Sequence, residues 1–203
     1  MTLTDAAAAS DLNEVITAGH DQLWQALGAC GTWWSGADRV AAIAEARQAL
    51  RCELCRARLE ALSPMMVAGK HDSISNMPEL AVDLIHRLTT DPGRLSKDWA
   101  SQVIESITEE AYVELATVIC VQYVIDSYSR CLGAPLRELP VAGEGEPSRI
   151  RPQGVGDVGA WVSQSLDKSL ANVSRAASLV PDTENLWREL VQIHYSRGPE
   201  FAA

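Results

Sequence analysis

Two cysteines three residues apart, Cys52 and Cys55, form the short motif with the most direct chemical content in this sequence. Residues at that spacing lie on the same side of a helix, so the two thiols can close a disulfide or share a ligand. Between positions 47 and 60 four arginines stand against two glutamates, a local charge of +2 in a chain of net charge −10. A nearby guanidinium favours the thiolate, the reactive form of cysteine. The motif therefore indicates redox chemistry, with packing cysteines beneath an ordinary solvated arginine face as the alternative.

Helical periodicity accounts for the elements that must position these thiols. Apolar residues recur at steps of three and four, and capping residues or Pro and Gly turns mark the ends of the segments. Ser35 and Asp38 have the spacing of a capping box and open a long helix that closes at Ser63 and Pro64. Because no segment shows sustained strand alternation, the expected fold is all-α with about seven helices. The expected helices cover residues 10–27, 35–62, 78–90, 96–107, 108–132, 161–180 and 182–195.

Both cysteines fall in the second half of the expected 35–62 helix. At about 100° per residue they share a face with Glu45, opposite the apolar stripe of that helix. The helix over 108–132 is apolar on most sides, which predicts a central position in the fold. We expect the cysteine face to pack toward this central helix.

Four stretches between residues 35 and 139 follow one another in a specific order: Arg39-Val-Ala-Ala-Ile-Ala-Glu-Ala-Arg, Cys52-Glu-Leu-Cys55, Leu80 to Leu88, and Thr108-Glu-Glu-Ala-Tyr-Val-Glu-Leu with Ser129-Arg-Cys-Leu-Gly133. This order resembles the carboxymuconolactone decarboxylase and alkyl hydroperoxidase D superfamily, and it is closest to the peroxidase-related branch. The resemblance implies an all-helical oligomer with the cysteine pair on a central helix. It also implies that one cysteine, matching Cys55, attacks a hydroperoxide and that the other resolves the sulfenic acid to a disulfide.

A glutamate and a histidine relay protons in that family, and the matching positions here hold Val40 and Leu59. We therefore expect other acids and bases to take their place. An imidazole near a thiol can accept its proton, and a carboxylate on an apolar helix needs a partner when buried. Structural histidines and salt bridges are the alternative for each candidate. The candidate catalytic residues are Cys52, Cys55, Glu45, His71, His86, Glu114 and Asp126.

The two cysteines of the motif together with His71 and His86 would also supply a Cys₂His₂ set for zinc. Their separations match no known zinc-finger spacing, so the sequence favours dithiol chemistry and predicts neither a metal nor another cofactor. Cys120 and Cys131 lie in the apolar 108–132 helix and are interpreted as buried packing residues.

The composition changes between residues 140 and 160 to glycine, proline and scattered charge, which is typical of an extended connector. We therefore expect a helical domain over 1–139, a connector over 140–160 and a helical extension over 161–203. The extension resembles the lead-in segment of peroxidase-related proteins, and we interpret it as reaching a neighbouring protomer of a homo-oligomer.

Charge and hydropathy exclude several classes of partner. With 17 basic and 27 acidic side chains among 203 residues, the chain lacks the general attraction that nucleic acids and anionic membranes require. No apolar run approaches the roughly 20 residues of a membrane span, and the N-terminus has no signal-peptide pattern, so a cytoplasmic protein is expected. Five cysteines, an odd number, fit free or transiently oxidised thiols better than a disulfide framework.

These observations predict an oxidoreductase that reduces a small hydroperoxide through a Cys52/Cys55 dithiol–disulfide cycle and is restored by a thiol reductant. One alternative is a cofactorless decarboxylase or isomerase of the carboxymuconolactone type, which would need no thiols. The other is a non-catalytic helical interaction protein in which the two cysteines only pack.

Overall fold

A computed structural model describes residues 3–169 and 172–195, and most of them are helical, as the predicted all-α class requires. Two short strands form an antiparallel pair in which Val155 lies opposite Ser165. The elements in chain order are α1 (Leu3–Leu27), α2 (Gly36–Ala49), α3 (Glu53–Glu60), the 3₁₀ turn η1 (Pro64–Met66), α4 (Glu79–Thr90), the 3₁₀ turn η2 (Pro92–Arg94), α5 (Lys97–Ile107), α6 (Glu109–Cys131), β1 (Val155–Gly156), β2 (Gln164–Ser165), α7 (Asn172–Arg175) and α8 (Pro181–His194).

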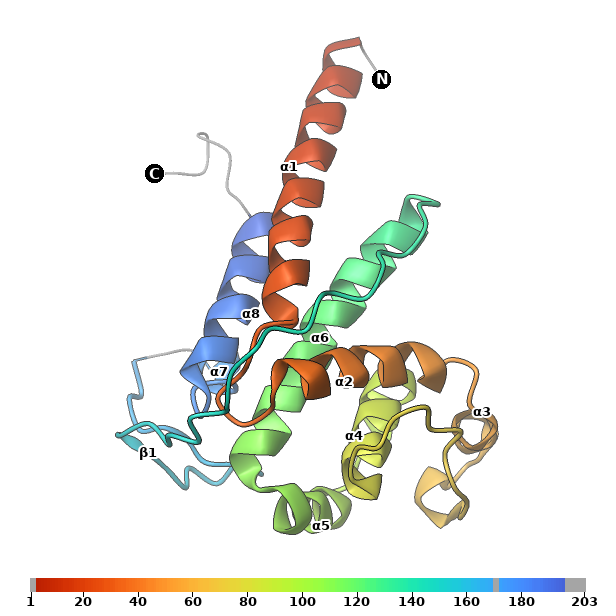
Figure 1. Cartoon of the computed structure of the whole chain (residues 1–203), viewed down its shortest axis with the longest axis vertical. Helices are drawn as coiled ribbons and strands as arrows, with labels where there is room; N and C mark the ends of the chain where they lie inside the picture. Colours follow the sequence, from red (N-terminus) through yellow and green to blue (C-terminus); the bar gives the residue numbers. More distant parts are fainter. Residues whose placement is uncertain (1–2, 170–171, 196–203) are drawn as a thin grey trace.

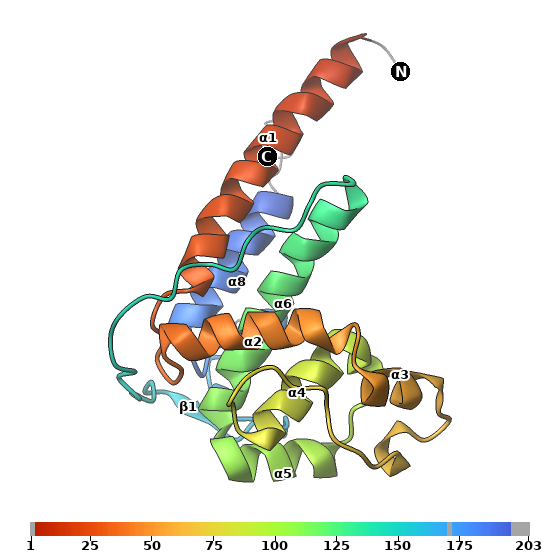
Figure 2. The ribbon, with the colours of Figure 1, turned by 45° about the vertical axis from the view of Figure 1, so that its right-hand side comes forward.

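Helix α6 takes the central position expected for the 108–132 segment (Figure 1). α1 and α8 lie along one part of it, while α2 crosses it and α4 and α5 pack against its N-terminal half (Figure 2). The buried side chains form two main clusters, one joining α2, α4 and α5 to the first half of α6 and the other joining α1 and α8 to its second half. α6 is therefore shared between two cores, which explains its apolar sequence.

Three of the seven expected helix starts are confirmed by side-chain caps. Ser35 and Asp38 form the reciprocal capping box at the start of α2. The side chain of Ser96 accepts a hydrogen bond from the Trp99 N–H at the start of α5, and Thr108 caps α6 in the same way. These side chains satisfy backbone N–H groups that have no partner inside the helix.

Three of the expected helices differ from the structure. α1 begins at Leu3, well before Ser10. The 161–180 segment is not one helix, because it contains β2 and the single turn α7, and Leu179 and Val180 at its end pack together on Val113 of α6. The long 35–62 helix is also wrong, since the chain leaves the helical path after Ala49 and begins a new helix at Glu53.

The chain after α6 runs back in extended form along α6 and α1 before it reaches the strands (Figures 1 and 2). The Trp24 indole donates to the Glu138 carbonyl at 2.7 Å, and the Gly143 N–H donates to the Gly28 carbonyl at 2.8 Å. A side chain at Gly28 would collide with the carbonyl of Val141, so this close approach requires glycine.

The C-terminal segment packs on its own chain. α8 lies against α1 and α6, and Leu190 is buried in their common core. This packing counts against the interpretation that the 161–203 extension reaches a neighbouring protomer, although residues 170–171 and 196–203 of that extension lie outside the described part. Among the described residues, no helix has the length and apolar character that crossing a membrane requires.

Candidate functional site

The cysteine pair occupies the first turn of α3 rather than the middle of a long helix. Cys52 is the N-cap residue, with extended backbone, and Cys55 lies in the turn that follows. The new helix end is stabilised from a distant loop, because the Asp72 carboxylate accepts the Glu53 N–H at 2.9 Å. Residues 49–53 contain no Gly or Pro, so tertiary contacts and not a local breaker divide the helix.

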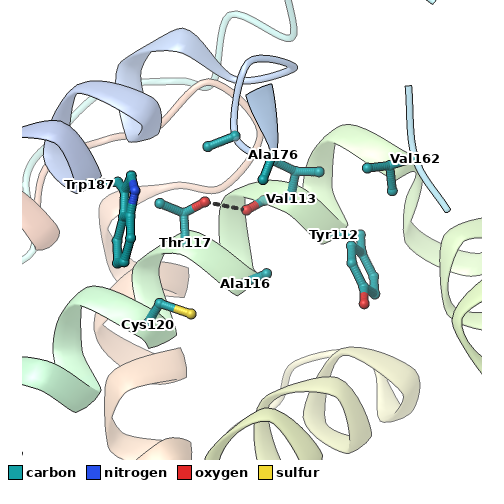
Figure 3. Close-up of a pocket in the computed structure, with 9 residues that line it drawn as sticks. Tyr112, Val113, Ala116, Thr117, Cys120, Val162, Ala176 and Trp187 are labelled. Carbon is teal, nitrogen blue, oxygen red and sulfur yellow. Dashed lines mark hydrogen bonds between the residues drawn. The ribbon is translucent and has the colours of Figure 1, made fainter. Parts of the chain in front are cut away.

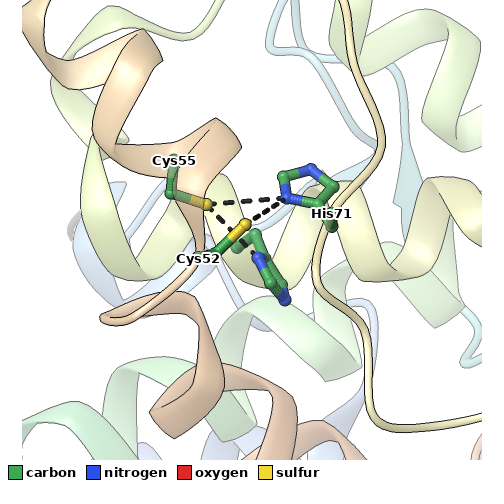
Figure 4. A group of neighbouring side chains, drawn as sticks. Cys52, Cys55 and His71 are labelled. Carbon is green, nitrogen blue, oxygen red and sulfur yellow. Dashed lines mark hydrogen bonds between the residues drawn. The ribbon is translucent and has the colours of Figure 1, made fainter.

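Two histidines from different elements face the two sulfur atoms (Figure 4). His71, from the loop between η1 and α4, places its Nδ1 3.5 Å from the Sγ of Cys52 and also 3.5 Å from the Sγ of Cys55. His86, from α4, places its Nδ1 3.3 Å from the Sγ of Cys55. The two imidazole rings are in contact, with centroids 4.2 Å apart. These four side chains, Cys52, Cys55, His71 and His86, are called the thiol–imidazole cluster below.

A buried glutamate holds the outer side of His86. The His86 Nε2 lies 3.0 Å from Glu45 Oε2, and both side chains are fully buried. The other oxygen of Glu45 accepts hydrogen bonds from the Ser73 hydroxyl and from the backbone N–H groups of Ile74 and Ser75, at 2.7–2.8 Å. Glu45 therefore orients His86 and also secures the loop that carries His71.

Asp83 orients His71 in the same way. Asp83 Oδ1 lies 2.8 Å from the His71 Nε2 and 2.6 Å from the Arg58 guanidinium. Asp83 Oδ2 accepts from the Arg87 guanidinium at 2.9 Å and from the Trp99 indole at 2.6 Å. Asp83 was not among the candidate residues expected from the sequence; the signal present was its i,i+4 spacing to Arg87 beside His86.

The two carboxylates determine which ring nitrogen carries the proton. Burial raises the pKa of Glu45, but its four hydrogen bonds outweigh this effect and lower the pKa to about 2. Hydrogen bonds from His71 and Arg58 likewise overcome burial and hold the pKa of Asp83 well below its usual range. An ionised carboxylate only accepts, so each neutral imidazole donates from Nε2 and keeps a lone pair on the Nδ1 that faces sulfur. Arg58 Nη1 also lies 3.2 Å from the His71 Nε2. This is not a hydrogen bond, because both nitrogens donate to the same Asp83 Oδ1.

The two thiols differ in their electrostatic surroundings. Burial disfavours the Cys52 thiolate, but the backbone N–H groups of Asp72 and Cys55 stabilise it, as does His71 once its Nδ1 has taken the thiol proton, so the pKa of Cys52 is lowered overall. Burial, followed by the neighbouring Cys52 sulfur, raises the pKa of Cys55 to about 12. Burial also lowers the pKa of His86, despite the opposing effect of the Glu45 carboxylate. The order of acidity thus places the negative charge on Cys52 first.

The other two predicted acids lie outside this cluster. Glu114 accepts from the Arg39 guanidinium at 2.7 Å and from the Trp33 N–H at 2.8 Å. Asp126 is held by both nitrogens of the Arg47 fork at 2.9 Å, while Arg130 is more distant at 3.9 Å. Each acid joins α6 to α2 through its arginine, which is the partner that a buried carboxylate requires. Neither acid reaches a thiol.

Three details of the predicted site are therefore corrected. The cysteines face α4, its preceding loop and Glu45, and not α6, because the break at residues 50–52 turns them away from the α2 face. Glu45 does not share a helix face with the cysteines, because it lies on α2 and reaches Cys55 only through His86. Cys120 and Cys131 are exposed rather than buried, because Cys120 lines an open cavity beside α6 and Cys131 is the last residue of that helix.

Two cavities reach the outer edge of the cluster at His71. Cys52 and Cys55 are only 1% and 4% exposed. Cavities of about 580 Å³ and about 210 Å³ both have His71 and Glu79 in their walls. The larger one is also lined by Arg58 and Asp83, so a small polar molecule in it would stand next to the outer edge of the cluster.

A separate apolar cavity of about 290 Å³ lies against α6, between Tyr112 and Trp187 (Figure 3). The Thr117 hydroxyl in its wall donates to the Val113 carbonyl at 2.9 Å and is thereby satisfied. The described residues of this wall carry no carboxylate or imidazole, and none of them belongs to the thiol–imidazole cluster. The chemistry of the described part of the chain is therefore concentrated at the cysteine pair.

No family model matches this chain, and neither the curated proteins nor the solved structures that were searched include a significant match. The resemblance drawn from the sequence remains a prediction.

Proposed function

We propose that this protein is a thiol-dependent oxidoreductase in which Cys52 and Cys55 cycle between dithiol and disulfide. A small hydroperoxide is the oxidant, and a thiol reductant restores the dithiol, as expected in the cytoplasm. The observation that supports this proposal best is the convergence of two Cys–His–carboxylate chains on one CxxC pair: Cys55–His86–Glu45 and Cys52–His71–Asp83.

Cys52 is the attacking residue in this proposal, in place of the Cys55 that the family resemblance suggests. Its sulfur lies at the N-terminus of α3, where backbone N–H groups and the helix dipole favour an anion. The His71 Nδ1 is within reach to accept the thiol proton, and Asp83 stabilises the imidazolium that results.

The cycle conserves atoms and electrons in two steps. The Cys52 thiolate attacks one peroxide oxygen, the O–O bond breaks, and the alkoxide leaves as an alcohol after it takes one proton. Cys55, deprotonated by His86, then attacks the sulfenic sulfur of Cys52 and expels hydroxide, which leaves as water. Two thiols and one hydroperoxide thus give one disulfide, one alcohol and one water, and a dithiol reductant reverses the oxidation by exchange.

A thiol count in a variant that lacks the three other cysteines, Cys30, Cys120 and Cys131, tests this function. We expect one equivalent of hydrogen peroxide to remove two thiols, and a thioredoxin-type reductant to restore them. In the same background, Cys55→Ser is expected to stop at a sulfenic acid on Cys52 that a dimedone probe captures. Cys52→Ser is expected to react at least about tenfold more slowly, because its remaining thiol is the less acidic one.

Two outcomes would contradict the proposal. Thiols that stay unchanged under peroxide while the protein remains folded would identify Cys52 and Cys55 as packing residues of a non-catalytic helical protein. Sulfenic acid trapped on Cys55 rather than on Cys52 would reverse the assigned roles and return the attacking role to the residue that the resemblance suggests.

A further inference from the structure

We propose that the thiol–imidazole cluster binds one Zn²⁺ ion while its cysteines are reduced, with Cys52 Sγ, Cys55 Sγ, His71 Nδ1 and His86 Nδ1 as the four ligands. These four atoms lie within 4.8 Å of one another. Two thiolates and two imidazoles form a donor set that zinc prefers among the common divalent cations. The inference concerns metal binding and does not depend on peroxide turnover.

The distances between the donor atoms fit a tetrahedral ion. With Zn–S near 2.3 Å and Zn–N near 2.05 Å, adjacent sulfur and nitrogen ligands are expected about 3.6 Å apart. Three of the four S···N separations in the cluster are 3.3, 3.5 and 3.5 Å, and the fourth, between Cys52 Sγ and His86 Nδ1, is within 4.8 Å. A separation of this size also suits an S–H···N hydrogen bond, so these distances fit both a metal site and a hydrogen-bonded cluster.

The position of His71 favours the metal site over the hydrogen-bonded cluster. Its Nδ1 is equally distant from both sulfur atoms, whereas one lone pair accepts a hydrogen bond from only one S–H group. A nitrogen lone pair directed between two sulfurs is the arrangement expected when all three atoms bind a common central cation.

Both histidines also have the outer partners that metal-binding histidines require. Ligating imidazoles donate their second N–H to a carboxylate, which orients the ring and makes the ligating nitrogen more basic. Glu45 accepts from the His86 Nε2, and Asp83 accepts from the His71 Nε2. Two independent carboxylate–imidazole pairs directed at one point favour a metal.

The charges around the cluster balance when the ion is bound. Two thiolates neutralise Zn²⁺, and the carboxylates of Glu45 and Asp83 stand against the guanidinium groups of Arg58 and Arg87, which both contact Asp83. The four protein ligands complete a tetrahedron and leave no position for substrate, which is typical of a structural zinc site. The ion would join α3, α4 and the loop between them, and would share the thiolates needed for the proposed cycle.

Sequence spacing concealed this site because zinc-finger histidines lie three to five residues apart. His71 and His86 are fifteen positions apart, and α4 rather than a local turn brings the second one to the cysteines. The tertiary structure thus provides the proximity that a finger obtains from local sequence.

Metal analysis of the untagged chain, purified under reducing conditions without chelators, tests the inference. We expect close to one zinc per chain in the wild type and less than about a tenth of that in Cys52→Ser/Cys55→Ser. The matched control Cys120→Ser/Cys131→Ser removes two cysteines outside the cluster and is expected to keep its zinc. Circular dichroism establishes that each variant is helical.

Cobalt titration of the metal-free, reduced wild type provides a test that needs no substitution. Binding is expected to saturate at one Co²⁺ per chain, with thiolate-to-cobalt charge-transfer absorption and the intense visible bands of tetrahedral coordination. Glu45→Gln is expected to weaken cobalt affinity about 10- to 100-fold, because it removes the carboxylate behind His86.

Oxidation distinguishes this inference from the proposed function. One hydrogen peroxide and two protons would convert the two zinc-bound thiolates to a disulfide and two waters and release Zn²⁺, which a chromogenic chelator detects. Zinc that is bound but not released, with unchanged thiols, would support the metal site and overturn the redox cycle. Reversible loss of two thiols in a chain that binds neither zinc nor cobalt would overturn the metal site and support the cycle.

Discussion

The side chains that distinguish this protein are two buried carboxylates whose hydrogen-bonding capacity is filled. Glu45 accepts from the loop at residues 73–75 and from His86, and Asp83 accepts from two arginines, a histidine and an indole. A buried ionised group is tolerated only with such partners. Each acid therefore stabilises the local structure and also orients one of the two histidines that face the thiols.

Glu45→Gln is predicted to lower the free energy of unfolding of the metal-free protein by about 2 kcal/mol. The new amide either places its N–H donors against the loop N–H groups, or places them against the His86 Nε2 and forces that ring into the other tautomer, with its proton facing the Cys55 sulfur. Denaturant titration in the presence of a chelator measures the change. Glu60→Gln, on the exposed surface of α3, is the control, and an equal effect of both substitutions would contradict the argument.

At the scale of elements, two ion pairs join α2 to the central helix. Arg39 pairs with Glu114 and Arg47 pairs with Asp126, so the contacts lie about two turns apart along α2. Gly31 permits the first pair, because a side chain there would collide with both the Glu114 carboxylate and the Arg39 guanidinium. These pairs fix how α2 crosses α6, and they thereby place Glu45 opposite α4.

Glu114→Gln is predicted to destabilise the fold by about 3 kcal/mol, because it leaves the buried Arg39 guanidinium without its counter-ion. Thermal or denaturant unfolding measures this loss, with Glu105→Gln on the exposed face of α5 as the control. Under conditions where both variants are folded, the rate of thiol oxidation by peroxide is expected to match the wild type. A slower rate in Glu114→Gln alone would show that this acid acts on the thiols after all.

At the scale of the whole molecule, helices α1 and α8, which are distant in sequence, pack against each other. α8 packs on α1, where the His20 and His194 Nε2 atoms lie 2.9 Å apart and Tyr128 of α6 stands edge-on to His20. Burial, followed by His194 and Arg137, lowers the pKa of His20 to about 4, against a weaker opposing effect of Asp21. Burial also lowers the pKa of His194. Two neutral rings can share one hydrogen between the facing nitrogens, whereas two charged rings would repel.

The docking of α8 on α1 is therefore predicted to weaken in acid. His20 has a lower pKa folded than unfolded, so its stabilising effect is complete above the unfolded value near 6.5 and is lost as the pH falls toward 4. Between pH 7.5 and pH 5 the wild type is expected to lose about 2 kcal/mol more than His20→Gln, as measured by denaturant unfolding at both pH values. Equal losses in the two proteins would show that carboxylates elsewhere cause the acid sensitivity.

Local sequence was sufficient to predict the class of this fold and the ends of several helices. The capping box at Ser35, the caps at Ser96 and Thr108, and the apolar character of the central helix each depend on neighbours within about one turn, so they can be recognised without the tertiary structure. The same holds for the chemical character of Cys52 and Cys55, since the thiol pair is adjacent in sequence.

The composition of the site depended on long-range contacts. No local signal divides the helix before Cys52, because its new N-terminus is capped by Asp72 from a distant loop. His71 and His86 were two candidates among several, and only the packing of α4 against α2 and α3 brings them to the sulfurs while Glu114 and Asp126 remain on α6. A side chain's type determines which chemistry it can perform, but the fold determines which groups are close enough to perform it together.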